Sequence, residues 1–432
     1  MSVLSFLLDV VQRSGYTHGQ PHRVAHIPHL VLSALAVILI VGVAGCSSRV
    51  ESAAATQAPV VISTLPPLPT ATTVPTYIGG AADHLLGVDN AHLNIVMYGD
   101  FQCEPCLDLA RVLAVLHDRY PDDVRIIWRH FPQPQNDKSR LAALASEAAS
   151  AQGKFWEMHD QLFTQQSQWT TLPPDQFRAK LTEYAKTIGV ADLAAFNAAI
   201  DNQTYGALID KATQEALDLD FKGVPVLLFN GLPYSGRVDE FALDSYTRLR
   251  LLEKRQYKHQ PDLIIDLKKK YTATLFTEKG NVVIELFTSA APVTVNNFVF
   301  LARDGWYNDN TLHRVIPNQL AQTGDPSSSG FGTAGYTIID EADNGLTFDR
   351  EGLVAMASQR NVRDSGSSQF FITYGPLRPA LDYDKQYTIF GHVTQGMDIL
   401  HKLTPRDPFD ELRFPNPPPG DKLIKVEISE SN

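Results

Sequence analysis

The sequence predicts a multidomain protein, in which an α/β domain with a helical insertion is followed by a β-barrel with capping helices. Three observations support this prediction. Between residues 82 and 254, strand-like runs alternate with long helical stretches. From residue 271 onward, short alternating runs are separated by many turn residues. Residues 255–270 form a polar break between the two regions, and 432 residues, 44% of them hydrophobic, are enough for two ordinary domains.

The composition argues against one class of partner. The formal net charge is −11 and the sequence contains no long basic run. Nucleic acid is therefore not expected as a ligand. Apart from its N-terminus, the chain has the composition of a globular protein.

The N-terminal segment has the pattern of an export signal. An apolar run, Leu30 to Gly45, follows Arg13 and Arg23 and ends directly before Cys46. The run is short for a bilayer-spanning helix but long enough for the core of a signal peptide. The sequence VAGC, which ends at Cys46, resembles the bacterial lipoprotein box. This resemblance implies that residues 1–46 contain a lipoprotein-type signal peptide and that Cys46 is lipidated as the mature N-terminus.

An uncleaved anchor helix is the alternative, and both interpretations place the rest of the chain outside the cytoplasm. Residues 47–81 are rich in Pro, Ser, Thr and Ala, with almost no charge and no sustained period. Such a segment cannot form a core by itself. We predict a tether that holds the folded domains at the extracytoplasmic face of the cell membrane.

The α/β domain begins with a buried strand at His92 to Phe101, where apolar and β-branched residues follow one another. A helix is predicted next, because apolar residues recur at helical spacing from Leu107 to Leu116 and Pro105 is acceptable in a first turn. Residues 123–130 predict the second strand. Residues 223–231 return to strand character after a long helical stretch.

The chain has three cysteines, Cys46, Cys103 and Cys106. A four-thiolate zinc site cannot be built from one copy, and a mixed Cys/His site would need distant histidines. We therefore expect no metal. If Cys46 carries lipid, Cys103 and Cys106 have only each other as intramolecular partners, in a compartment that permits disulfides.

Cys103 lies where the predicted strand delivers the chain to a helix N-terminus. Unsatisfied backbone N–H groups and the positive end of the helix dipole stabilise a thiolate at such a place, as disulfide exchange requires. Cys106 follows one turn later and is near enough to close a disulfide. Glu104 places an acid between the sulfurs and opposes the dipole, so oxidase, reductase and isomerase directions stay open. A cysteine pair that only staples a loop is the structural alternative.

Residues 82–254 resemble the thioredoxin fold of the DsbA-like kind. The matching segments are the CEPC motif behind its strand, WRHFP, EAASAQGKFWEMHDQLF and the GVP turn. The resemblance implies that Cys103 is the attacking thiol and Cys106 the resolving thiol. It also implies a cis-proline at Pro225, opposite the motif, with the backbone of Val224 presented to the substrate. A thioredoxin scaffold that only binds peptides is the alternative.

The second domain opens with a predicted hairpin at Thr274 to Phe287, in which two alternating runs flank a Lys-Gly turn. Residues 291–306 predict a helix, with Pro292 in its first turn and Gly305 at its end. Further short strands with many turn residues complete the pattern of a barrel with a capping helix.

Residues 271–432 resemble cyclophilin, a peptidyl-prolyl isomerase. Four motifs occur in the family's order, namely LHRVIPNQLAQTGDP (312–326), GLVAMA (352–357), SSQFFIT (367–373) and YTIFGHVTQGMDIL (387–400). Rotation about an X–Pro bond meets a barrier of roughly 20 kcal/mol, because amide resonance is lost. A catalyst needs an apolar pocket for the proline ring and a cation that stabilises the twisted amide. The resemblance assigns this cation to Arg314.

The resemblance also implies that Gln322 and Gln369 hold the substrate backbone. The implied pocket residues are Leu320, Ala357, Phe371, Leu381 and Tyr387. Two residues depart from the family's pattern: Gln319 stands where a pocket phenylalanine is usual, and Ala380 where many members have tryptophan. These departures predict an activity below the family's norm and weaker binding of cyclosporin-type inhibitors.

We therefore expect a membrane-tethered folding factor that is both a peptidyl-prolyl cis-trans isomerase and a protein thiol-disulfide oxidoreductase. Its expected partners are unfolded or secreted polypeptides and a redox protein that the sequence does not identify. Neither reaction needs a cofactor. A chaperone-like protein that only holds extended peptides is the alternative, and turnover, as opposed to binding, separates the two.

Overall fold

The structure is a computed structural model, and the residues it describes are 83–377, 383–410, 412–414 and 417–432. The predicted lipidation site Cys46, the tether, Ala380 and the pocket residue Leu381 lie outside the described residues. Among the helices that are described, none has the length and hydrophobicity of a membrane span.

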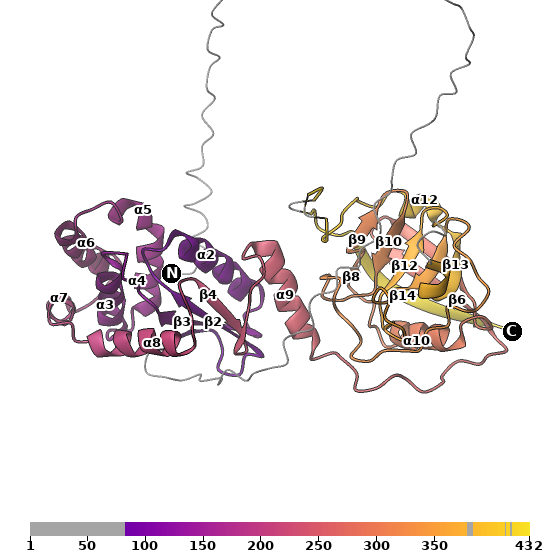
Figure 1. The fold of residues 1–432 in the computed structure, drawn as a ribbon, viewed down its shortest axis with the longest axis horizontal. Coiled ribbons are helices and arrows are strands. Elements are labelled where there is room, and N and C mark those ends of the chain that lie inside the picture. Colours follow the sequence, from indigo (N-terminus) through magenta and orange to yellow (C-terminus); the bar gives the residue numbers. More distant parts are fainter. Residues whose placement is uncertain (1–82, 378–382, 411, 415–416) are drawn as a thin grey trace, which may run out of the picture. The chain divides into compact units, whose positions relative to one another are not determined.

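The first domain is built on a five-stranded sheet with the order β1-β3-β2-β4-β5 (Figure 1). Its strands are β1 (His84–Leu86), β2 (Leu93–Gly99), β3 (Val124–His130), β4 (Val226–Phe229) and β5 (Leu232–Pro233). Strands β2 and β3 are parallel, and the other neighbouring pairs are antiparallel. The predicted strands are confirmed, although β4 is shorter than expected because Pro225 has no N–H to offer a ladder.

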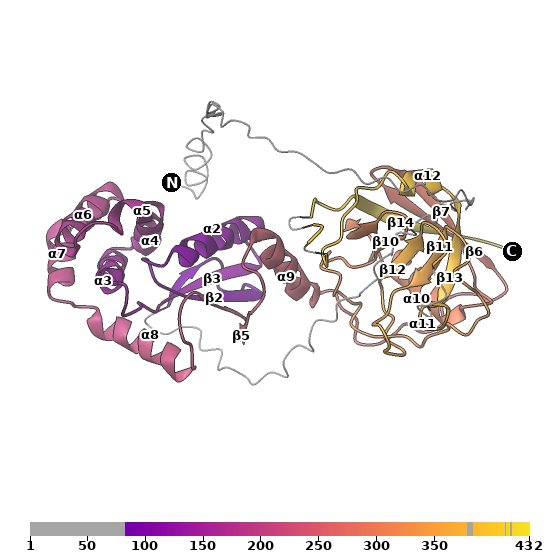
Figure 2. The ribbon, with the colours of Figure 1, turned by 45° about the horizontal axis from the view of Figure 1, so that its top comes forward.

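Helices pack on this sheet, and most of the inserted helices form a group at one end of the domain. Helix α2 (Glu104–Arg119) directly follows Cys103, and α9 (Glu240–Leu252) follows β5. The inserted helices between β3 and β4 are α3 (Ser139–Ser150), α4 (Phe155–Thr164), α5 (Gln166–Trp169), α6 (Pro174–Thr187), α7 (Leu193–Asp201) and α8 (Gly206–Asp218). Helices α3 to α7 gather at the same end of the domain in both views (Figures 1 and 2). The predicted helical insertion is confirmed.

The core of the first domain joins the sheet to α2 and to the insertion. Phe101, Leu109, Trp128 and Phe163 belong to one buried cluster, which draws on the strands, on α2 and on α4. The buried sulfur of Cys106 belongs to the same cluster. The segment around the dithiol therefore packs against both the sheet and the helical insertion.

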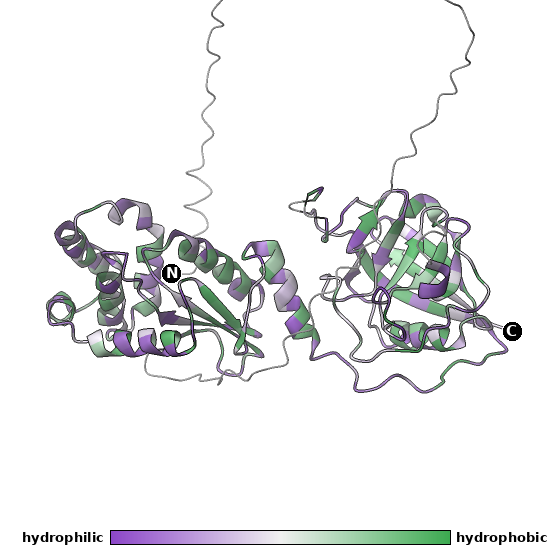
Figure 3. Cartoon of the chain, viewed as in Figure 1, coloured by the Kyte–Doolittle hydropathy of each residue, from purple (hydrophilic) through white to green (hydrophobic). Residues whose placement is uncertain are grey.

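The second domain is a curled antiparallel sheet that forms a half-barrel, with the strand order β8-β14-β6-β7-β13-β11-β12-β10-β9. The strands are β6 (Lys270–Thr277), β7 (Gly280–Leu286), β8 (Asn310–Thr311), β9 (Arg314–Ile316), β10 (Leu320–Thr323), β11 (Leu353–Met356), β12 (Phe370–Thr373), β13 (Ile389–Gln395) and β14 (Lys422–Ser431). Strands β6 and β7 confirm the predicted hairpin. The hydropathy colouring shows that the strands of this sheet are largely hydrophobic (Figure 3).

The helices of the second domain are α10 (Pro292–Arg303), α11 (Tyr383–Gln386) and α12 (Met397–Leu400). Helix α10 closes the core of the half-barrel. The ring centroid of Phe298 lies 5.2 Å from those of Tyr307 and Phe370 and 5.3 Å from that of Phe390. The predicted capping helix is confirmed.

Candidate active sites

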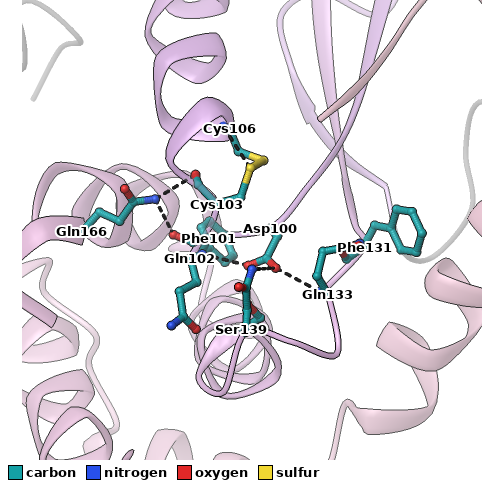
Figure 4. Close-up of a disulfide and its surroundings, with 10 residues drawn as sticks. Asp100, Phe101, Gln102, Cys103, Cys106, Phe131, Gln133, Ser139 and Gln166 are labelled. Atoms are coloured by element: carbon teal, nitrogen blue, oxygen red, sulfur yellow. Dashed lines mark hydrogen bonds between the residues drawn. A yellow bond between two sulfur atoms is a disulfide. The ribbon is translucent and has the colours of Figure 1, made fainter. Parts of the chain in front are cut away.

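The two sulfurs of the first domain lie at the N-terminus of α2 and form a disulfide (Figure 4). Cys103 is the N-cap residue, and the backbone N–H of Cys106 donates to its sulfur over 3.1 Å. Cys103 is partly exposed, whereas Cys106 is completely buried. The sulfur that another protein can reach is therefore that of Cys103, and it is also the one next to the helix N-terminus.

A buried carboxylate, Asp100, organises the turn before the dithiol (Figure 4). Its oxygens accept hydrogen bonds from the backbone N–H groups of Gln102 and Gln133, from the amide of Asn136 and from the hydroxyl of Ser139. These four donors hold the carboxylate in place. Sequence reasoning missed Asp100, although a polar residue at the end of a buried strand, three positions before a cysteine, is a signal that could have found it.

A glutamine from the helical insertion holds the backbone of Cys103. Gln166, at the start of α5, donates from Nε2 to the carbonyl oxygens of Phe101 and Cys103, each over 2.9 Å (Figure 4). Its side chain is buried. No sequence pattern pointed to this residue, because it lies 63 positions beyond Cys103.

The predicted proline turn lies beside the strand end that leads to the dithiol. The peptide bond between Val224 and Pro225 is cis, which confirms that part of the resemblance. In the pairing of β4 with β2, Val226 lies opposite Tyr98, so Pro225 lies beside the end of β2, from which the chain continues to the dithiol. Val224 and Cys103 pack against the same hydrophobic cluster.

A buried cluster of His84, His130 and Glu147 offers two imidazoles and a carboxylate, a donor set that suits zinc. The Nε2 atoms of His84 and His130 are both within hydrogen-bond distance of Oε1 of Glu147, at 2.7 Å and 2.8 Å respectively. However, Trp128 donates its indole N–H to Nδ1 of His130 over 3.2 Å. The Nε2 atom of a neutral His130 must then carry the proton, and a protonated nitrogen cannot bind a metal. The residues fit a hydrogen-bonded carboxylate better than a metal centre.

The pKa values of Glu147 and His130 in this cluster are both lowered. Burial raises the pKa of Glu147, but the hydrogen bonds from His130 and His84 outweigh burial and bring the pKa to about 2. Burial lowers the pKa of His130, against the opposing effect of Glu147. At neutral pH the cluster is therefore an anionic Glu147 held by a neutral His130.

In the second domain, the sheet register aligns three predicted site residues and Ala355 in one row across neighbouring strands. Gln322 lies opposite Arg314 on one side and Phe371 on the other, and Ala355 lies opposite Phe371. The strand neighbours of these four residues belong to the core of the half-barrel, namely Val315, Ala321, Val354 and Ile372. Because side chains alternate along a strand, the row lies on the opposite face of the sheet.

Hydrogen bonds connect the polar residues of this face. Gln322 donates from Nε2 to Oε1 of Gln369 over 2.8 Å, and Gln369 donates to the carbonyl oxygens of Gly330 and Gly332. The backbone N–H of Ala357 donates to the carbonyl of Gln369. The structure therefore places Gln322, Gln369 and Ala357 together.

The predicted apolar residues lie on the same face. The ring of Tyr387 stands perpendicular to that of Phe371, with centroids 5.3 Å apart, and burial raises the pKa of Tyr387 to about 12. Leu320 precedes Gln322 by two positions on β10, so its side chain points the same way. Gln319, which directly precedes β10, is partly exposed.

Arg314 is buried and paired with Asp407, a residue that sequence reasoning missed. Asp407 lies 93 positions from Arg314, in a loop without a periodic pattern. Burial lowers the pKa of the neighbouring His313 to about 4, so the imidazole is neutral at physiological pH. Arg314 and Asp407 therefore form an ion pair beside a neutral imidazole at this edge of the sheet.

Comparisons with known proteins match both domains. A family model described as "Cyclophilin type peptidyl-prolyl cis-trans isomerase/CLD" matches residues 272–425, and one described as "Thioredoxin" matches residues 81–246. A solved cyclophilin-type isomerase of Cryptosporidium parvum is 30% identical, covers 38% of this chain and 99% of that chain, and has a TM-score of 0.34. Oxidised BdbD of Bacillus subtilis is 21% identical, covers 39% of this chain and 91% of that chain, and has a TM-score of 0.36.

A peptidyl-prolyl cis-trans isomerase of Helicobacter pylori is 38% identical over 151 residues. These residues are 34% of this chain and 90% of the Helicobacter protein. The first domain is thioredoxin-like in sequence and fold. Through its second domain, the chain belongs to the family of cyclophilin-type peptidyl-prolyl cis-trans isomerases.

Proposed function

We propose that this protein is an extracytoplasmic folding factor that exchanges disulfides at Cys103 and Cys106 and isomerises prolyl bonds at Arg314. The observation that carries the proposal is a disulfide at a helix N-terminus in the same chain as a cyclophilin-type isomerase domain. Disulfide formation and prolyl isomerisation are both slow steps of folding, and exported polypeptides need both.

Disulfide exchange begins at the exposed sulfur. A thiolate of the unfolded substrate attacks Sγ of Cys103, and the bond to Cys106 breaks as the mixed disulfide forms. Cys106 leaves as a thiolate and takes up a proton. A second substrate thiolate then attacks the mixed disulfide, which yields a substrate disulfide and a reduced Cys103. Two electrons pass from the substrate to the protein, and a separate redox protein accepts them to restore the disulfide.

The backbone around the dithiol favours a thiolate at Cys103. The N–H of Cys106 points at its sulfur, and the positive end of the α2 dipole lies there. The same features make Cys103 the better leaving group when the mixed disulfide is resolved. The reverse sequence reduces a substrate disulfide, and the reduction potential of the pair decides the direction.

Prolyl isomerisation uses the row of residues on the outer face of the sheet. Phe371, Leu320 and Tyr387 offer an apolar surface to the proline ring. The amides of Gln322 and Gln369 offer polar contacts to the substrate backbone. As the peptide bond twists, the nitrogen lone pair is freed from resonance, and an N–H of Arg314 donates to it.

The experiment that tests the combined function is oxidative refolding of a reduced secreted protein that has both a disulfide and a cis-proline. We expect the wild-type chain to exceed an equimolar mixture of the Cys103→Ser and Arg314→Ala chains, because a substrate bound at one site meets the other at raised effective concentration. Equal rates would mean that the two sites act independently. Binding of the unfolded protein without any acceleration would favour the second candidate, a chaperone-like peptide-binding protein, to which the polar Gln319 also points.

The proposed tether has its own test. Metabolic labelling with a fatty acid should mark the wild-type chain and leave Cys46→Ser unlabelled, and the variant should be released from the membrane fraction. Labelling that survives the substitution would remove the lipid from the proposal while leaving both reactions in place.

A further inference from the structure

The isomerase site contains a second buried charge, which the resemblance to cyclophilin did not assign. Arg314 is 3% exposed and faces the carboxylate of Asp407, which is also buried. Its Nε lies 3.1 Å from Oδ1 and its Nη2 lies 3.0 Å from Oδ2. This is the side-on, two-point pairing in which an arginine has a defined orientation as well as a partner.

The backbone places Asp407 beside Arg314. Val315 and Arg406 form an isolated antiparallel bridge at the free edge of β9. The N–H of Val315 donates to the carbonyl of Arg406 over 2.7 Å, and the N–H of Arg406 donates back over 2.9 Å. The residues flanking a bridged pair share one face, so the partners of the ion pair meet through the register of the chain.

The pairing leaves one end of the guanidinium without a partner. Nε and Nη2 face the carboxylate, so Nη1 points away from it, and Nη1 is buried with no hydrogen-bond partner among the described residues. A buried donor without a partner is costly, because it has given up its hydrogen bonds to water. Such a cost is expected where a donor is held ready for an atom that arrives with the substrate.

We propose that Asp407 is a positioning residue for prolyl isomerisation, which fixes the guanidinium of Arg314 so that Nη1 meets the nitrogen of the twisted amide. Without Asp407, the long side chain of Arg314 would sample several rotamers and would turn toward other acceptors or solvent. The carboxylate touches no reacting atom in this proposal. It acts only through the orientation of Arg314.

Phe409 completes the arrangement. Its backbone N–H donates to Oδ1 of Asp407 over 3.1 Å, and the centroid of its ring lies 5.4 Å from Cζ of Arg314. The ring packs directly on Gly330, where a Cβ would lie 2.3 Å from Cζ of the phenylalanine. The carbonyl of Gly330 is one of the two that accept hydrogen bonds from Gln369. Phe409 thus shields the ion pair from water, which strengthens the hydrogen bonds of the guanidinium.

The test uses Asp407→Asn in the full chain, with kcat and KM measured on a prolyl tetrapeptide by an exchange method that needs no protease. We expect kcat to fall by about ten- to a hundred-fold, because misorientation of a catalytic group costs factors of this size. KM should stay near the wild-type value, since the interaction strengthens only in the twisted state. The matched control is Asp410→Asn, in the same loop, which should leave both constants unchanged.

A second comparison separates positioning from a structural role. In an Arg314→Ala background, where the unpaired charge is also removed, Asp407→Asn should cause no further loss of kcat. If kcat of the double variant fell by the product of the two single losses, Asp407 would act independently of Arg314 and would only support folding. An unchanged or raised kcat in Asp407→Asn alone would also overturn the proposal, and a raised value would make the loop an inhibitory cover.

Discussion

The dithiol and the isomerase arginine differ in how the protein handles their charge. Cys103 is partly exposed at a helix N-terminus, and it becomes charged only during exchange. Arg314 is always charged, and it is 3% exposed and paired with Asp407. Covalent exchange requires a sulfur that another protein can reach. Stabilisation of a twisted amide requires a donor whose direction is set in advance, in surroundings that exclude water.

The two sites are nevertheless supported in a similar way. In each, one side chain from a segment distant in sequence holds the reactive group or its backbone. Gln166 holds the carbonyl of Cys103, and Asp407 holds the guanidinium of Arg314. The dithiol is therefore fixed through its main chain, and the arginine through its side chain.

The largest effect is expected from the cysteine substitutions, which should remove disulfide exchange and leave prolyl isomerisation intact. Cys103→Ser should abolish disulfide exchange, and Cys106→Ser should accumulate mixed disulfides, because the resolving thiol is missing. Non-reducing electrophoresis after incubation of the reduced variants with a disulfide-containing substrate measures both outcomes, because the remaining thiolate then attacks the substrate disulfide and one substrate sulfur leaves as a thiolate. Neither variant should change the rate of prolyl isomerisation. Equal trapping by both variants would reverse or remove the assigned order of attack.

The converse substitution is Arg314→Ala. Loss of a preorganised donor to a developing charge costs about 10²- to 10³-fold in kcat, and we expect a loss of that order in a prolyl-isomerisation assay. The rate of disulfide exchange is the internal control and should not change. If the isomerase rate were unaffected, Arg314 would have no catalytic role and the domain would be a peptide-binding module.

Glu147 and His313 should make the two domains sensitive to acid over different pH ranges, and the lowered pKa of His130 adds a loss below pH 6.5 in the first domain. Glu147 has a pKa of about 2 in the folded domain and 4.5 as its ordinary value, so its contribution is complete above pH 4.5 and is lost as the pH falls toward 2. His313 has a pKa of about 4 and an ordinary value of 6.5. The unfolded chain binds this proton first, so stability falls from pH 6.5 down to 4. Each difference corresponds to about 3 kcal/mol.

Hydrogen exchange measured as a function of pH resolves the two domains and checks these ranges. Glu147→Gln should flatten the dependence below pH 4.5 in the first domain only. His313→Gln should flatten the dependence between pH 6.5 and 4 in the second domain only. An unchanged pH profile in either variant would contradict the corresponding assignment.

A smaller effect is expected from Gln166→Ala. The carbonyls of Phe101 and Cys103 would lose a shared donor in a buried place, which costs about 1–3 kcal/mol of unfolding free energy. We also expect the reduction potential of the dithiol to change, because the turn that carries Cys103 loses its support. Gln168→Ala, on an exposed position of the same short helix, is the matched control. An unchanged potential would limit Gln166 to a structural role.

The smallest expected effect is a gain. Full burial of a phenylalanine side chain is worth roughly 1.5–3 kcal/mol, but position 319 is partly exposed, so Gln319→Phe should recover only part of this. An increase of a few-fold in kcat/KM for prolyl peptides is expected. Disulfide exchange again serves as the control. No gain would mean that the aromatic wall is supplied by another residue of the site.

Sequence alone was enough to predict the local features of this protein. The alternation at residues 274–287, the cysteines between a strand and a helix, and the helix that begins at Pro292 each depend on neighbouring residues, and the structure confirms all three. The family motifs also predicted the cis bond at Pro225, which the structure confirms. They marked Arg314 and Gln322 as site residues, and the sheet register places these two opposite each other. Periodicity and motif order need no knowledge of distant contacts.

Only the tertiary structure decided which distant residues support these features. Gln166 reaches Cys103 across 63 positions, and Asp407 reaches Arg314 across 93. Glu147 meets His84 across 63 positions. Each of these contacts joins a reactive or buried group to a segment whose own pattern carries no sign of its partner. Such pairs arise from the path of the chain and the register of its sheets, which local sequence does not specify.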